Sequence, residues 1–142
     1  NYVIFGYNTS GIGSITQVLT TGVAYNITSD ERVKNDLGVS TDTSVIDNLV
    51  IHDFEWKEDN RLDRGVFAQE AINVKPDAVT KGRTEDLGDD GLPENPWGVD
   101  YSKYVPDLIV YCQQLKKTIQ ELNATVTAQA AEIAALKAKV GA

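Results

Sequence analysis

Apolar residues recur in a heptad pattern along the last third of the chain. Two series, each with a spacing of seven, interleave at alternating steps of three and four residues. They are Val105, Cys112, Ile119, Val126, Ile133 and Val140 at the a positions, and Leu108, Leu115, Leu122, Gln129 and Leu136 at the d positions. This pattern predicts a long helix that forms a coiled coil over residues 105–140.

The residue types in this pattern indicate how such helices would associate. β-branched residues at a and leucine at d favour a dimer. The polar Gln129 layer fixes the register of the helices more than their number, so a coiled coil of two or of three helices stays open. Glu132 at g can reach Lys137 at e of a neighbouring helix when the chains run parallel. Tyr104, Ile109 and Tyr111 widen the apolar face at the start, which predicts packing there and a free helix beyond.

Residues 29–104 contain short segments of mixed periodicity, typical of a small α+β domain. Residues alternate in character around His52 as in a strand, and a helical pattern stops before Pro76. His52 is expected to face the partly polar side of a core. The expected elements are a helix at 42–49, a strand at 50–57, a turn at 59–64, a strand at 65–67, a helix at 68–74, a strand at 79–83 and a loop at 85–96.

Residues 1–28 have strand propensity but too little apolar mass for a core of their own. Residues 2–6 and 12–21 are β-prone, and Thr, Ser, Gly and Asn are frequent throughout the segment. We therefore expect this segment to intertwine with copies of itself or with preceding chain. The sequence contains no methionine, which indicates that it is a piece of a longer protein.

The charge balance argues against several classes of partner. The chain has 13 Lys and Arg against 21 Asp and Glu, a net charge of -8. We expect neither nucleic acid, which needs a basic face, nor an anionic membrane surface as a partner. No apolar run reaches the roughly 20 residues of a membrane-spanning helix. One cysteine cannot form an intrachain disulfide, which fits a reducing compartment.

The sequence shows no metal or cofactor motif. The acidic loop at 85–96 fails as a calcium loop: with Asp86 as the first ligand, Gly88 takes the third position and Trp97 the twelfth, where a glutamate is needed. A single histidine and a single cysteine do not supply a zinc site. We therefore expect no metal and no cofactor.

The junction after residue 28 carries candidate chemistry. Ser29 precedes Lys34 by five positions, and Arg32 lies between them. A serine and a lysine can act as nucleophile and base without a histidine. The structural alternative is that Ser29 caps a helix with acidic residues in its first turn. Because five positions are about 140° around a helix, the pair requires Ser29 to lie outside the helix, or a different lysine.

These motifs in their order resemble the C-terminal intramolecular chaperone domain of bacteriophage endosialidases, tailspikes and tail fibres. That domain is a self-cleaving serine-type module, also found in the eukaryotic myelin regulatory factors. The resemblance covers residues 29 to about 139, and it is the order and spacing of the motifs that make it specific. They are Ser29-Asp30-x-Arg32-x-Lys34, Phe54-x-Trp56-Lys57, Gly65-x-x-Ala68-Gln69-Glu70, Val99-Asp100-Tyr101 and the terminal coiled coil.

The resemblance implies that the chain cuts itself once, between Thr28 and Ser29, and turns over no other substrate. Ser29 would be the nucleophile and Lys34 the base. The candidate supporting residues are Arg32, Gln69 and Glu70.

The resemblance also implies a homotrimer with the a and d residues as its interface. Residues 1–28 would be the end of a β-structured fibre or tailspike stem. Residues 29–142 would be the chaperone domain, with a globular part at 29–104 and the coiled coil at 105–140. It would act on the upstream fibre in the host cell cytoplasm and be released by cleavage, while the fibre joins the virion tail. The alternative is a non-catalytic coiled-coil oligomerisation or adaptor module of a fibrous protein.

Overall fold

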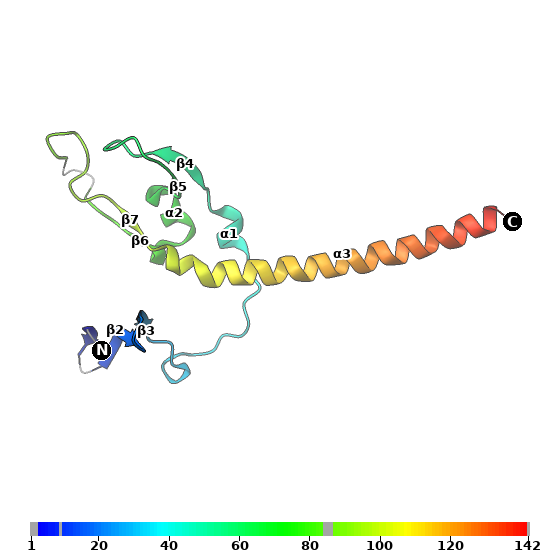
Figure 1. Cartoon of the computed structure of the whole chain (residues 1–142), viewed down its shortest axis with the longest axis horizontal. Helices are drawn as coiled ribbons and strands as arrows, with labels where there is room; N and C mark the ends of the chain where they lie inside the picture. Colours follow the sequence, from blue (N-terminus) through cyan, green and yellow to red (C-terminus); the bar gives the residue numbers. More distant parts are fainter. Residues whose placement is uncertain (1–2, 9, 84–86, 142) are drawn as a thin grey trace. The chain divides into compact units, whose positions relative to one another are not determined.

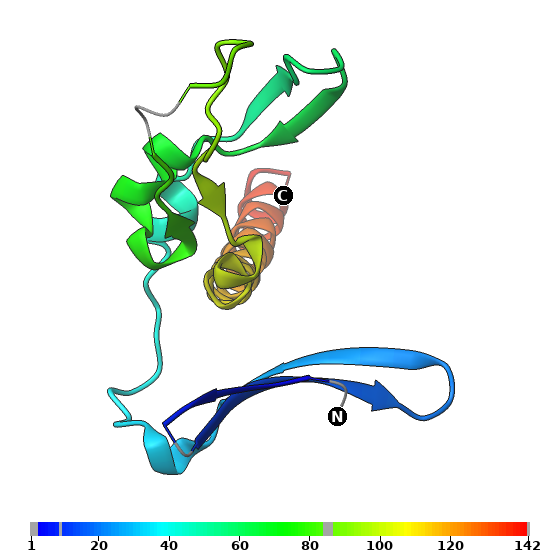
Figure 2. The ribbon, with the colours of Figure 1, turned by 90° about the vertical axis from the view of Figure 1, so that its left-hand side faces the viewer.

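The computed structural model describes residues 3–8, 10–83 and 87–141. The chain divides into two compact units, Asn1–Val39 and Ser40–Ala142, whose elements are visible in Figures 1 and 2. Within the described ranges, no helix combines the length and the hydropathy needed to cross a membrane.

The first unit is a three-stranded antiparallel sheet with the strand order β1-β2-β3. Its strands are β1 (Val3–Tyr7), β2 (Ser10–Val18) and β3 (Gly22–Ile27). Figure 2 shows β2 and β3 as a long curved hairpin. The strands predicted at 2–6 and 12–21 are confirmed as β1 and β2, although Tyr2 lies outside the described residues. The sequence reasoning missed β3, whose pairing to β2 runs from Gly13 opposite Ile27 to Val18 opposite Gly22.

This sheet has no core of its own. No residue of the unit whose exposure is described is buried, and the side chains of Tyr25 and Ile27 are 80% and 86% exposed. An antiparallel sheet is stable when at least one face packs against another layer. The predicted shortage of apolar mass is therefore confirmed, and pairing with further copies of the chain stays a prediction.

The second unit combines short helices and strands with one long helix, which confirms the mixed α and β content predicted from the sequence. Its elements are α1 (Ser44–Asn48), β4 (His52–Glu55), β5 (Leu62–Gly65), α2 (Ala68–Val74), β6 (Val79–Thr80), β7 (Gly98–Val99) and α3 (Val105–Val140). The strands form two antiparallel pairs, β4 with β5 and β6 with β7. Single 3₁₀ turns at Pro76–Ala78 and Tyr101–Tyr104 connect the elements around α2 and α3.

The helix predicted at 68–74 is confirmed without a shift, whereas the strand after the turn was misplaced. The sequence predicted a turn at 59–64 and a strand at 65–67, but β5 occupies Leu62–Gly65. Pairing with β4 decides this register, because His52 lies opposite Gly65 and Glu55 opposite Leu62. The strand predicted at 79–83 is only Val79–Thr80.

The predicted loop at 85–96 contains an isolated bridge between Leu87 and Pro93. Glu85 and Asp86 of this loop lie outside the described residues. Asp86 is the residue considered above as the first ligand of a calcium loop.

The small core of this unit joins α2 to the start of α3. Its buried apolar residues are Val66, Ala68, Ala71, Ala78 and Tyr104. Lys75, at the end of α2, forms an ion pair with Asp107 of α3 at 3.0 Å between Nζ and Oδ2. The Val66 N–H donates to Tyr101 Oη at 3.1 Å, which connects the turn before α3 to the end of β5.

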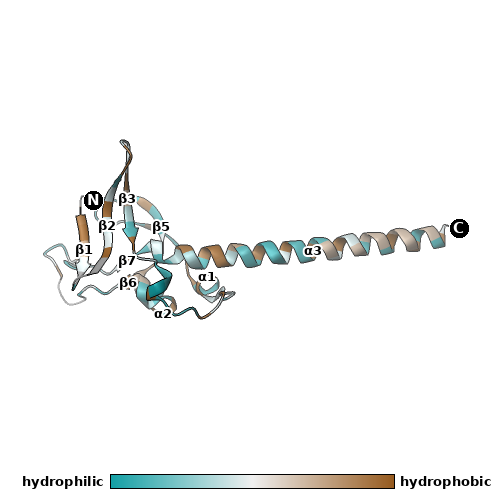
Figure 3. Cartoon of the chain, turned by 90° about the horizontal axis from the view of Figure 1, so that it is seen from below, coloured by the Kyte–Doolittle hydropathy of each residue, from teal (hydrophilic) through white to brown (hydrophobic). Residues whose placement is uncertain are grey.

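Only the first turns of α3 pack against the rest of this unit. The half-buried residues are Asp107, Val110, Tyr111 and Gln114, and every residue from 115 to 141 is exposed. These four residues take heptad positions c, f, g and c, so the a and d face stays uncovered. Leu108 and Leu115, for example, are 50% and 49% exposed. Figure 3 shows apolar positions recurring along the helix. The predicted helix, packed at its start and free beyond, is confirmed.

Candidate active site

The chain leaves the sheet immediately before the candidate serine. The N–H of Thr28 donates to the carbonyl of Ile12 in β2 at 3.3 Å, so the β-type pairing of β3 extends to this residue. Ser29 follows, and a single 3₁₀ turn then spans Glu31–Val33. The N-cap of this turn is Asp30. The alternative in which Ser29 caps a helix is therefore wrong, because the cap lies one residue later.

The turn brings the candidate nucleophile and base together. Lys34 Nζ donates to Ser29 Oγ at 2.7 Å. A 3₁₀ turn closes in three residues, and Lys34 leaves it in an extended conformation with φ -129 and ψ 146. Ser29 thus lies outside the helical turn, and the long lysine side chain reaches back to it. Both side chains are exposed to solvent in the single chain.

Asp30 and Arg32 form a bidentate ion pair beside these two residues. Arg32 Nε lies 2.9 Å from Asp30 Oδ1 and 3.1 Å from Oδ2, and the backbone N–H of Arg32 donates to Oδ1 at 2.9 Å. The guanidinium lowers the pKa of the Asp30 carboxyl, and the backbone bond and the Lys34 charge act in the same direction. The carboxylate in turn raises the pKa of Arg32. We call this arrangement the Asp30–Arg32 pair.

Charged side chains in the first unit are confined to a short segment. Residues 1–29 contain no Asp, Glu, Lys or Arg, so the charges of this unit begin at Asp30. Asp36 Oδ1 accepts a hydrogen bond from the N–H of Gly38 at 2.8 Å. The Asp30 carboxylate is therefore bound to Arg32, and the Asp36 carboxylate is bound to a backbone N–H. The Lys34 amine is directed to a neutral hydroxyl.

The other two candidate residues belong to the second unit, in the first turn of α2. Glu70 Oε2 lies 2.8 Å from His52 Nε2, and the His52 ring stacks on Phe67 at 4.1 Å between ring centroids. The backbone carbonyl of Gln69 accepts from Asn73 Nδ2 at 3.3 Å. His52 is therefore half-buried between an aromatic ring and a carboxylate, as expected for a strand residue on the partly polar side of a core.

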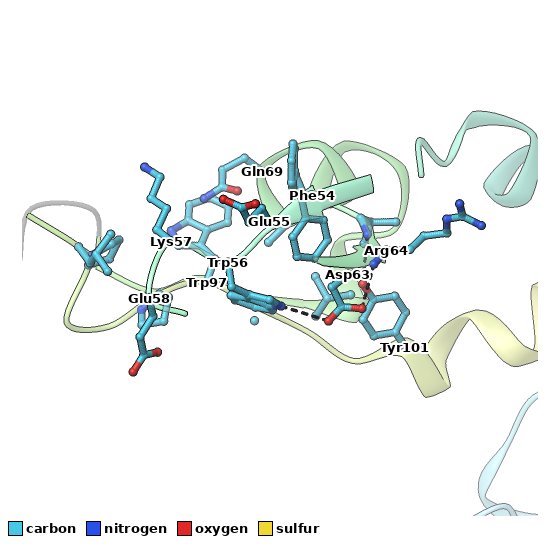
Figure 4. Close-up of a pocket in the computed structure, with 18 residues that line it drawn as sticks. Phe54, Glu55, Trp56, Lys57, Glu58, Asp63, Arg64, Gln69, Trp97 and Tyr101 are labelled. Atoms are coloured by element: carbon cyan, nitrogen blue, oxygen red, sulfur yellow. Dashed lines mark hydrogen bonds between the residues drawn. The ribbon is translucent and has the colours of Figure 1, made fainter. Parts of the chain in front are cut away.

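A groove of about 760 Å³ lies on the second unit, next to Gln69 (Figure 4). Aromatic residues in and just after β4, just before α2 and in the segment before α3 line it, among them Phe54, Trp56 and Trp97. Trp56 Nε1 donates to Asp63 Oδ2 at 3.1 Å, as the dashed line in the figure shows. The sequence reasoning did not foresee this groove, because its walls come from segments about 40 residues apart.

The sequence reasoning also missed the part that Asp30 plays. Asp30 enters the sequence analysis only as part of the motif Ser29-Asp30-x-Arg32-x-Lys34, whereas the structure makes it the cap of the turn and the partner of Arg32. An aspartate two residues before an arginine, in a segment with turn propensity, is the signal that could have indicated this pair. Among the residues that the structure describes, no cluster of three or more His, Cys, Asp or Glu could hold a metal ion.

Comparison with known proteins finds a similarity between part of the chain and a family. Residues 29–80 match the family model Peptidase_S74, described as chaperone of endosialidase. No curated protein matches the chain. The matched segment begins at Ser29 and contains Lys34, Gln69 and Glu70. The resemblance predicted from the sequence is thereby confirmed over residues 29–80, and a chaperone role is supported. Over residues 29–80, the chain is therefore similar to the family described as chaperone of endosialidase.

Proposed function

We propose that the protein is an intramolecular chaperone that cleaves its own chain between Thr28 and Ser29. The observation that carries this proposal is the 2.7 Å hydrogen bond between Lys34 Nζ and Ser29 Oγ. It lies at the start of a segment that matches a chaperone family whose name includes a peptidase.

The proposed reaction is an acyl shift followed by hydrolysis. Neutral Lys34 accepts the proton of the Ser29 hydroxyl, and Oγ attacks the carbonyl carbon of Thr28. The C–N bond then breaks as the proton passes to the Ser29 nitrogen, which leaves an ester between Thr28 and Ser29 Oγ. Water hydrolyses this ester to a carboxylate on Thr28 and a free hydroxyl on Ser29. The reaction separates the residues of its own site, so each chain reacts once.

Both sides of the bond are held by the first unit, which supports this chemistry. The Thr28 N–H is bound to Ile12, and the Ser29 hydroxyl is bound to Lys34. Restricting the reacting groups in this way lowers the entropic cost of reaching the transition state.

The packing of α3 supports a parallel homotrimer as the assembled form. The residues that pack on the helix's own unit take positions c, f and g, while the a and d residues stay exposed. An apolar face of this length is covered when helices from several chains associate through it. Three strands follow from the family resemblance, since the residue types at a and d alone favour two.

The proposed purpose is to bring three copies of the upstream fibre together. Strands wound from three chains depend on contacts far apart in sequence and fold slowly, with edges exposed to aggregation. A helical bundle forms from local contacts and aligns the chains before that slow step. Cleavage then removes the bundle, so that the fibre persists because its unfolding is slow. The domain acts in the host cytoplasm, and the fibre belongs to the virion tail.

Mass spectrometry under denaturing conditions tests the cleavage. The wild-type chain is expected to yield a fragment that begins at Ser29, and Ser29→Ala and Lys34→Ala are expected to stay intact. Ser40→Ala, at another exposed serine, is the matched control and is expected to be cut. Cleavage of Ser29→Ala at the same bond would show that Ser29 is not the nucleophile. An intact wild-type chain that still assembles through α3 would favour a non-catalytic oligomerisation module.

A further inference from the structure

We propose that Asp30 and Arg32 are positioning residues for the self-cleavage, and that Arg32 acts by keeping the Asp30 carboxylate from binding the Lys34 amine. This inference rests on the proposed cleavage at Thr28–Ser29. Neither residue contacts the scissile bond in this role, since both act through the placement of Lys34.

The first argument concerns what holds the turn. Its backbone bonds are those from the N–H of Val33 to Asp30 and from the N–H of Lys34 to Glu31, at 3.3 and 3.0 Å. Val33 is 71% exposed, and no residue of the turn is buried. A single helical turn is unstable without side-chain contacts. The Asp30–Arg32 pair supplies such contacts, because the carboxylate binds both the backbone and the side chain of Arg32.

The second argument concerns competition for the lysine. An ammonium is attracted more strongly to an anionic carboxylate than to a neutral hydroxyl, because the carboxylate carries the opposite charge. Asp30 directly follows Ser29, yet both of its oxygens bind Arg32 and Lys34 binds Ser29. Without the guanidinium, the Asp30 carboxylate would attract Lys34 and hold it in the charged form. A charged lysine away from the hydroxyl cannot accept its proton.

The other charges of the first unit do not replace this effect. Strands β1 to β3 contain no charged side chain. The remaining carboxylates near Lys34 in sequence are Glu31 and Asp36, and Asp36 binds the N–H of Gly38. The balance between Asp30 and Arg32 is therefore expected to determine which acceptor Lys34 binds.

The test measures the rate of cleavage against pH in the full-length protein. Arg32→Gln is expected to slow cleavage at neutral pH on the order of tenfold and to move the profile up by about one pH unit. Asp30→Asn, Arg32→Gln is expected to return the profile towards wild type, because the competing carboxylate is gone. The asparagine Oδ1 can still accept from the backbone N–H of residue 32. If the pair served only to hold the turn, the double variant would stay as slow as Arg32→Gln, because the two partners of one ion pair do not act additively.

Two further variants make the result specific. Arg32→Lys keeps a positive charge beside Asp30 and is expected to give a profile closer to wild type than Arg32→Gln. Glu31→Gln removes one negative charge from the adjacent residue and is expected to keep the wild-type profile. An unchanged profile in Arg32→Gln, or a double variant that is no faster than Arg32→Gln, would overturn the inference. An uncut wild-type chain would instead refute the proposed cleavage itself.

Discussion

Gly65 ends β5 at a point where Tyr101, in the turn before α3, leaves no room for a side chain. A Cβ at this position would collide with Tyr101 Oη, the same oxygen that accepts the N–H of the buried Val66. Gly65→Ala is therefore expected to displace the phenol and leave that N–H without its partner. The loss of such a bond costs about 1–3 kcal/mol, which thermal unfolding of the second unit would measure.

Gly98 offers a matched control for this substitution. An added Cβ there meets no atom within 4 Å, so Gly98→Ala is expected to leave the melting temperature nearly unchanged. Tyr101→Phe removes the same hydrogen bond without a collision. If Gly65→Ala acts by displacing the phenol, combining it with Tyr101→Phe should cost much less than the sum of the two. A full additive loss would contradict this explanation.

Single residues also show how far the sequence could predict the site. The spacing of Ser29 and Lys34 was readable, and the structure places their side chains within hydrogen-bond distance. The shape of the turn between them was not readable, because it depends on the side chain of Asp30. Catalytic roles for Gln69 and Glu70 stay predictions, and Glu70 is bound to His52 in the structure.

At the scale of elements, the ion pair between Lys75 and Asp107 fixes the start of α3 against the end of α2. Both side chains are mostly shielded, with 19% and 22% exposed. Lys75→Met is expected to destabilise the second unit by about 1–3 kcal/mol, because it leaves the Asp107 carboxylate without its partner. Denaturant unfolding measures this loss. Asp107→Asn added to Lys75→Met should recover part of it.

The same ion pair predicts how the stability of the second unit changes at alkaline pH. The hydrogen bond with Asp107 raises the pKa of Lys75 above its usual value of 10.5. A group whose pKa is raised in the folded state adds stability to the protein. This stability is complete below the pKa of the unfolded state and disappears as the pH rises through the pKa of the folded state. Wild-type stability should therefore fall above about pH 10.5 more steeply than that of Lys75→Met. Parallel curves for the two proteins would exclude this contribution.

The bounds of an element were predictable where the local sequence pattern determines them. They were not predictable where pairing with another strand determines them. The helix at Ala68–Val74 has its own apolar period and a proline beyond its end, so its bounds were correct. β5 carries the charged residues Asp63 and Arg64, and it becomes a strand because it pairs with β4, where Arg64 binds Asp53. That pairing partner is the preceding strand, outside the segment itself, and no pattern within residues 62–65 identified it.

At the scale of the whole molecule, the uncovered face of α3 predicts which substitutions break the assembly. Leu122 lies at a d position and is 58% exposed in the single chain. Leu122→Glu is expected to dissociate the proposed trimer at micromolar concentration, because a charge buried without a partner costs several kcal/mol. Ala124→Glu places the same charge at the outer f position and should leave the trimer intact. Sedimentation measures both, and equal effects would place the interface elsewhere.

The proposed chaperone role predicts an asymmetry between losing the domain and losing its cleavage. Deleting residues 29–142 from the full-length protein should leave the upstream fibre insoluble or monomeric. Ser29→Ala should still give folded trimers, which lose their quaternary structure at a lower temperature than cut ones. Native electrophoresis after heating separates these outcomes. Normal trimers from the deleted protein would refute the chaperone role.

The confinement of charge to the segment after Ser29 has a consequence for how the assembly responds to salt. All 13 basic and 21 acidic side chains lie beyond the bond proposed to break, and so does the whole net charge of -8. In the proposed trimer, three copies would repel one another through this charge, and the repulsion would be screened over about 10 Å at 0.1 M salt. Salt should therefore stabilise the uncut assembly. After cleavage, residues 1–28 would keep only the new terminal carboxylate, and their association should become almost indifferent to ionic strength.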